Sequence, residues 1–162
     1  MDRAPVDQGH FLFMSSTRIA GIDYGTVRIG IATADLEVGI AGAYKTYTRR
    51  NQKLDAEYFC QLANEQQLAK FVVGLPVHLS GKESKKSCEA RQFGAWLAEI
   101  TDLPVEYFDE RFTSAEAESL LSDSQLTSKK RKARLDQLAA QIMLTAYLDS
   151  GAKGQNSPGS IE

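Results

Sequence analysis

The alternation of apolar and polar positions predicts a strand-rich first third of the chain and a helix-rich remainder. Five runs are short, apolar and bounded by glycine, proline or polar residues, as strands usually are. These runs are residues 17–24, 28–35, 41–49, 70–76 and 103–110. Only Gly25, Thr26 and Val27 separate the first two runs, so we expect an antiparallel hairpin there.

Apolar residues recur at helical spacing in the segments between and after these runs. One helix is predicted over residues 54–68 and another around Trp96. Thr113 followed by Glu116 is a capping-box pattern that predicts a third helix, and a last helix is predicted from near Asp136. This order of elements implies an α/β fold. The expected sheet is mixed and five-stranded, with its first three strands antiparallel and helices on both faces.

Length and composition predict one folded domain. The 162 residues suffice for a single core, with a flexible extension over residues 1–16, a domain over 17–150 and a disordered tail over 151–162. No apolar run is long enough for a bilayer and no signal-peptide pattern is present, so we expect no membrane contact. Cys60 and Cys88 stand far apart and, with two histidines, form no zinc motif, which favours a reduced, cytoplasmic compartment.

Acidic residues end two of the predicted strands. Asp23 closes the first apolar run, and Asp109 and Glu110 close the last. An Asp before a glycine is often only a turn residue. However, strands that end at one sheet edge would bring these carboxylates together, and clustered carboxylates repel one another unless a divalent cation neutralises them. Asp136 is a third candidate, as a cap of the last helix or as a ligand aimed at the same edge.

Basic residues gather in two segments, although the net charge of the chain is −2. The first is a run that by default forms a solvated surface loop: Lys129, Lys130, Arg131, Lys132 and Arg134. The second follows the fourth strand, and two further arginines stand near the acids: Lys82, Lys85, Lys86 and Arg91, with Arg28 and Arg111. All are candidate contacts to a nucleic-acid backbone, although Arg111 could equally pair with a neighbouring acid. No aromatic stacking platform is evident in the sequence.

Four segments together resemble the YqgF family, also called RuvX. They read "GIDYGTVRIGIA", "FVVGLPVHLSGKES", "VEYFDERFTSAEAE" and "KKRKARLDQLAAQIMLTAYLDS". In order and spacing they cover residues 18–150, and the combination of D-x-G-T, V-G-L-P, D-E-R-x-T and D-x-x-A-A is specific. One departure is Ala133, where a glycine is expected in relatives.

The resemblance implies an RNase H-like fold and a hydrolase that cuts phosphodiester bonds with metal-activated water. It implies that Asp23, Glu110 (or its neighbour Asp109) and Asp136 hold Mg²⁺ or Mn²⁺. The implied partners are RNA or branched DNA and ribosomal precursor particles, bound by a monomer or a homodimer. Maturation of the 5′ end of pre-16S rRNA is the favoured function. The alternatives are a Holliday junction resolvase and a non-catalytic nucleic-acid-binding domain.

Two features argue against other functions for the same motifs. D-x-G-T-x-x-x-G also opens the phosphate loop of actin-like ATPases and sugar kinases, but those proteins need two such domains and we expect one here. A domain that only binds nucleic acid would not need three acids. We therefore favour the enzyme.

Overall fold

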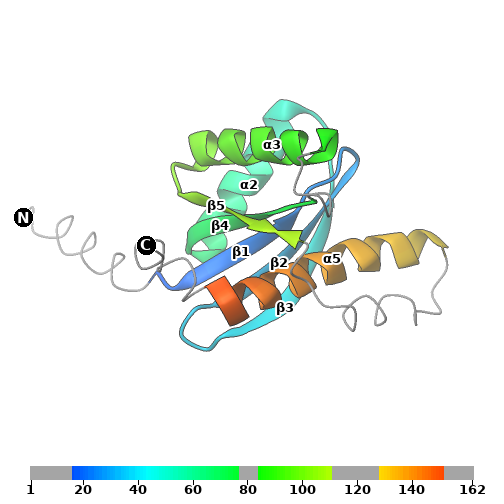
Figure 1. Cartoon of the computed structure of the whole chain (residues 1–162). Coiled ribbons are helices and arrows are strands. Elements are labelled where there is room, and N and C mark those ends of the chain that lie inside the picture. The colour runs from blue at the N-terminus through cyan, green and yellow to red at the C-terminus, as the bar shows by residue number, and fades with distance from the viewer. Residues whose placement is uncertain (1–15, 77–83, 111–127, 152–162) are drawn as a thin grey trace, which may run out of the picture.

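The computed structural model describes residues 16–76, 84–110 and 128–151, and these build one mixed sheet with helices on both sides (Figure 1). The strands are β1 (Arg18–Asp23), β2 (Arg28–Asp35), β3 (Ile40–Thr48), β4 (Leu68–Leu75) and β5 (Val105–Asp109). Their order across the sheet is β3-β2-β1-β4-β5. The first three are antiparallel neighbours, whereas β1, β4 and β5 run parallel. The predicted five-stranded sheet is confirmed.

Each face of the sheet has its own apolar cluster. The helices are α2 (Gln52–Gln66), α3 (Lys85–Thr101) and α5 (Ser128–Ala146), the last continued by a π-helical turn, η2 (Tyr147–Gly151). Phe59 of α2 and Phe93 of α3 pack on one face, and Met143 and Leu144 of α5 pack on the other. The predicted cover on both faces is therefore confirmed. Among the described residues, no helix has the length and apolarity needed to cross a bilayer.

Helix α5 begins earlier than the sequence predicted. The run from Lys129 to Arg134 forms its first turns rather than a surface loop, and Asp136 lies in the third turn rather than at the start. Both predictions were wrong because lysine, arginine and alanine are good helix formers and nothing in this segment ends a helix. Lys85 and Lys86 form the first turn of α3, where Ser84 caps the helix by accepting from Ser87 N at 3.1 Å.

Several earlier expectations lie outside the described residues. They are the extension before Ser16, the helix opened by Thr113, and the tail after Gly151.

Glycines in the sheet allow α5 to lie against the backbone of β1 and β2. A Cβ on Gly30 of β2 would overlap the carbonyl oxygen of Asp136, and a Cβ on Gly21 of β1 would lie 3.1 Å from the Cβ of Leu144. Next to Gly30 across the ladder, Thr46 of β3 donates its hydroxyl hydrogen to the carbonyl of Ala133. The sheet therefore fixes the position of α5 at the third turn.

We expect Gly30→Ala to lower the free energy of unfolding by about 2–3 kcal/mol, because its methyl group must displace the α5 backbone. Gly42→Ala in β3 is the matched control, since nothing lies within 4 Å of its Cβ position. The control should leave stability unchanged or raise it by up to about 1 kcal/mol. Urea unfolding followed by circular dichroism measures both, and equal stabilities would contradict the packing described here.

Candidate active site

Asp23 lies at the carboxyl end of β1, on the face that α5 covers. Side chains alternate along a strand, and Ile19 and Gly21 of β1 both face α5. Asp23 shares their parity and therefore points to the same side. It pairs across the ladder with Gly30 of β2. This is the glycine against which α5 rests.

Asp136 reaches the same place from the helix. Its backbone lies on Gly30, the cross-strand partner of Asp23. Its carboxylate accepts a hydrogen bond from Arg28, with 2.7 Å between Arg28 Nε and Asp136 Oδ2. Arg28 was expected to contact phosphate. In the structure it pairs with one of the acids.

Glu110 directly follows β5, which lies on the other side of β1 from β2. Its carboxylate occupies the space where a side chain on Gly74 of β4 would be. Gly74 faces α5, because its neighbour Val73 belongs to the opposite cluster. Asp109 pairs with Leu75 and has the opposite parity, on the α3 side of the sheet. The geometry thus separates the two neighbours and sets Glu110, rather than Asp109, on the face of Asp23.

Asp23, Glu110 and Asp136 form what we call the acid edge, and its electrostatics reflect their proximity. Burial of the carboxyl group, with the negative charges of Glu110 and Asp136, raises the pKa of Asp23 from 3.8 to about 7. Burial also raises the pKa of Glu110. The ammonium group of Lys86 opposes both shifts. The acid edge is therefore a place where negative charge is costly and a cation is favoured.

The acid edge has the chemistry of a divalent-cation site, although its side chains do not converge. Across residues 16–76, 84–110 and 128–151, no three His, Cys, Asp or Glu side chains lie close enough to hold one ion. Arg28 holds the carboxylate of Asp136. The donor set is nevertheless one of carboxylate oxygens, which Mg²⁺ and Mn²⁺ prefer.

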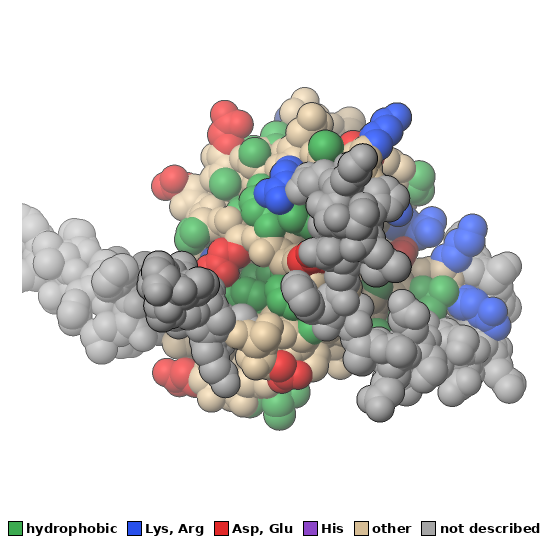
Figure 2. Space-filling model, in the orientation of Figure 1, with side chains coloured by type: hydrophobic (Ala, Val, Ile, Leu, Met, Phe, Trp, Pro, Cys, Tyr) green, Lys and Arg blue, Asp and Glu red, His purple; other side chains and the backbone are tan. Residues whose placement is uncertain are grey.

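The candidate phosphate contacts lie near the acid edge in two groups. Lys85 and Lys86 are exposed at the start of α3. The basic residues of α5 with exposed side chains are Lys130, Arg131, Lys132 and Arg134. In Figure 2 the Lys and Arg side chains lie mainly on the right, where both helices begin, and in Figure 1 the first turns of α5 extend beyond the sheet.

Other candidate contacts are placed differently. Arg91 lies with its guanidinium 5.2 Å from the ring centre of Tyr107, on the β5 side of α3. Lys82 and Arg111 fall outside the described residues, and Lys129 is described only as part of the α5 backbone.

Two glycines that build the acid edge were not predicted from the sequence. Gly30 and Gly74 make room for Asp136 and Glu110, respectively. A glycine inside a strand pattern indicates close approach of another group, so the signal was present. The ion pair between Arg28 and Asp136 had no such signal, because it joins residues 108 positions apart.

Known proteins resemble this chain in sequence and in fold. A family model described as RuvX, Holliday junction resolvase, matches residues 17–150. A protein of Rhodopirellula baltica named as a candidate pre-16S rRNA nuclease is 44% identical over 138 residues, covering 85% of this chain and 80% of that protein. One of the same name from Neisseria gonorrhoeae is 43% identical over 129 residues, covering 80% and 85%.

Among solved structures, T. thermophilus RuvC in complex with a Holliday junction substrate superimposes with a TM-score of 0.50. The match covers 83% of this chain and 96% of that one at 12% identity, so it bears on the fold alone. The RNase H-like fold predicted from the sequence is confirmed by this match together with the strand order.

We expect Asp23→Asn to stabilise the metal-free protein at pH 8 by about 1 kcal/mol or more. The folded state holds the Asp23 proton more tightly than the unfolded state does, so wild-type stability falls as pH rises from about 4 to about 7. The advantage of the variant should therefore shrink below pH 5. Thermal unfolding in EDTA measures this, with Glu57→Gln on the exposed side of α2 as the control. A difference that does not change with pH would show that Asp23 titrates normally.

Proposed function

The chain belongs to the RuvX family, and we propose that it is a divalent-metal-dependent nuclease that hydrolyses phosphodiester bonds in precursor 16S rRNA. The observation that carries the proposal is the acid edge, where three carboxylates from β1, the end of β5 and α5 lie on one face of the sheet. Burial, together with the negative charges of the other two acids, raises the pKa of Asp23. The names of the relatives favour pre-16S rRNA as the substrate. Action on precursor rRNA would place the protein in the cytoplasm.

In this proposal Asp23, Glu110 and Asp136 hold Mg²⁺ or Mn²⁺. When bound, such a cation activates a water molecule and stabilises the charge that develops on the phosphate. Asp23 is the central ligand, because it couples electrostatically to both of the other acids. Asp109 has no part in ligation, since it has the parity of the opposite face.

Arg28 has two partners in this proposal. In the structure its guanidinium pairs with the carboxylate of Asp136. If Asp136 held the cation, the guanidinium of Arg28 could bind a substrate phosphate beside the acid edge instead of this carboxylate. Arg28 would then help to orient the scissile phosphate.

The exposed bases of α3 and α5 bind the nucleic-acid backbone on either side of the acid edge. Lys86 acts closest to the reaction, because its charge already reaches Asp23 and Glu110. The first turns of α5 present further positive charge beyond the sheet. Contacts of this kind position a backbone without reading its sequence.

A second candidate substrate is a four-way DNA junction. It is favoured by the description of the matching family as a Holliday junction resolvase. Symmetric cleavage of a junction needs two active sites and therefore a homodimer, whereas trimming of an RNA end can be done by a monomer. Sedimentation of the protein alone and with each substrate distinguishes the two.

We expect Asp23→Asn, Glu110→Gln and Asp136→Asn each to slow Mg²⁺-dependent cleavage of an RNA spanning the 5′ end of 16S rRNA by roughly 100-fold or more. Loss of a group that merely supports a metal ligand costs roughly 10–100-fold, and loss of a ligand should cost at least as much. Asp109→Asn is the matched control and should cleave at close to the wild-type rate. The proposal fails if Asp23→Asn cleaves as fast as wild type, or if cleavage persists in EDTA.

We expect the double variant Lys132→Gln, Arg134→Gln to bind the same RNA more weakly in EDTA and with a shallower dependence on salt. Each phosphate contact that is lost should reduce the slope of log K against log salt by about 0.7–0.9. Arg18→Gln is the control, because Arg18 bonds Gln66 at the opposite end of β1. Fluorescence anisotropy at several salt concentrations gives both slopes, and identical slopes would remove α5 from the RNA-binding surface.

A further inference from the structure

An open cleft of about 790 Å³ lies at the same end of the sheet as Asp23, on the α2 and α3 side. We call it the hairpin cleft, because Tyr24 of the β1–β2 turn forms one wall. The connection from β3 to α2 contributes Arg49, and α3 contributes Gln92, Phe93 and Trp96. Its volume falls within the range of about 300–1,000 Å³ that ligand pockets usually have. The cleft shares no residue with the acid edge.

Aromatic rings form a continuous wall in the hairpin cleft. The ring centres of Tyr24 and Phe93 are 5.1 Å apart, and those of Phe93 and Trp96 are 5.4 Å apart. Phe93 is only 5% exposed and anchors the wall in the core, whereas Tyr24 and Trp96 are half-buried. An aromatic surface that is fixed from behind and open in front can stack a nucleobase.

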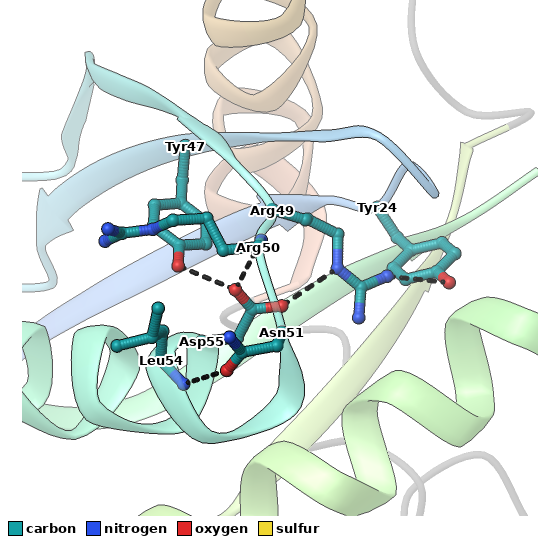
Figure 3. A network of polar contacts seen from close by, with 7 residues as sticks. All are labelled: Tyr24, Tyr47, Arg49, Arg50, Asn51, Leu54 and Asp55. Carbon is teal, nitrogen blue, oxygen red and sulfur yellow. Dashed lines mark hydrogen bonds and ion pairs between the residues drawn. The ribbon is translucent and has the colours of Figure 1, made fainter.

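Arg49 places a fixed positive charge against the Tyr24 ring of this wall (Figure 3). Its Nε lies 3.3 Å from Oδ2 of Asp55, its Nη1 donates to the Tyr24 hydroxyl at 3.2 Å, and its guanidinium lies 5.5 Å from the Tyr24 ring centre. Asp55 is 2% exposed and also accepts from the Tyr47 hydroxyl at 2.6 Å and from the Arg50 backbone N–H at 2.9 Å. These bonds fix the position of the Arg49 guanidinium.

The charge balance of the hairpin cleft favours one nucleotide over a long run of phosphates. Asp55 and Glu89 offset Arg49 and Arg50, so no large excess of positive charge remains. The exposed side-chain amide of Gln92 is suited to hydrogen bonding with the polar edge of a base. A π face, one phosphate and a polar edge are together what an unpaired nucleotide offers.

Helix α3 joins the hairpin cleft to the acid edge. Lys86 in its first turn acts on Asp23 and Glu110, and Gln92, Phe93 and Trp96 follow two to three turns later along the helix. Tyr24, at the other wall, directly follows Asp23 in sequence. An RNA strand with one phosphate at the acid edge would pass around the carboxyl end of β1, where Asp23 and Tyr24 adjoin, to reach the cleft on the other face.

We propose that the hairpin cleft binds an unpaired nucleotide of the RNA substrate, with its base stacked on Tyr24 and Trp96 and its phosphate bound to Arg49. The site selects substrates in which a single-stranded segment adjoins the bond to be cut. This inference rests on the proposed function for the identity of the ligand, but it concerns a separate site.

The test uses Trp96, which is the only tryptophan of the chain, as its own reporter. Wild-type protein in EDTA is titrated with a short single-stranded oligouridylate carrying a dye, and tryptophan emission and dye anisotropy are recorded together. We expect saturable quenching of Trp96 that follows the anisotropy, and little quenching by a fully paired duplex of the same length. Arg49→Gln should weaken the quenching titration roughly tenfold, because a charged hydrogen bond is lost.

Two further variants guard against a loss of folding. Gln92→Glu changes an exposed residue and adds negative charge at the hairpin cleft, so it should also weaken binding in the quenching titration. Arg18→Gln should bind like wild type, because Arg18 lies at the opposite end of β1. The proposal is overturned if anisotropy reports binding while Trp96 emission stays constant, if neither signal changes, or if Arg49→Gln and Gln92→Glu both titrate like wild type. None of these outcomes bears on cleavage at the acid edge, which the carboxylate variants test independently.

Discussion

The site depends on one packing constraint: helix α5 can approach the sheet closely only where β1 and β2 carry no side chains. Gly30 is such a position, and the backbone at Asp136 occupies the space that a side chain there would fill. Because Gly30 pairs with Asp23, this contact brings an acid of the last helix beside an acid of the first strand. Gly74 makes the same kind of room for Glu110. The lack of a side chain at Gly30 and at Gly74 thus determines where the acids of the acid edge lie.

The fold could be predicted from the sequence because its elements have strong local signals. The hairpin at Gly25, the apolar run ending at Leu75 and the helical spacing around Trp96 each follow the pattern of their element. The start of α5 could not be predicted from charge patterning, because a run of lysine and arginine suits both a solvated loop and an exposed helix. Packing of the following turns on the sheet decides between the two.

The candidate site was predicted in part. That Asp23 and the neighbours Asp109 and Glu110 stand at strand ends can be read from the sequence, because each closes an apolar run. The choice of Glu110 over Asp109 needed the register of β4 and β5. The hairpin cleft was not predicted, because its aromatic wall joins Tyr24 with Phe93 and Trp96, about 70 positions away in the sequence. The helical spacing of Phe93 and Trp96 indicates only that they belong to the apolar face of a helix.

The ion pair between Arg28 and Asp136 has a consequence for how the protein matures. Together with a proton on Asp23, whose pKa is about 7, it lets the chain balance its own clustered carboxylates. Small metal-dependent domains that lack such internal compensation stay unfolded until their ion binds. This scaffold instead offsets part of its own carboxylate charge as it folds, so the proposed cation would bind to a domain that is already folded.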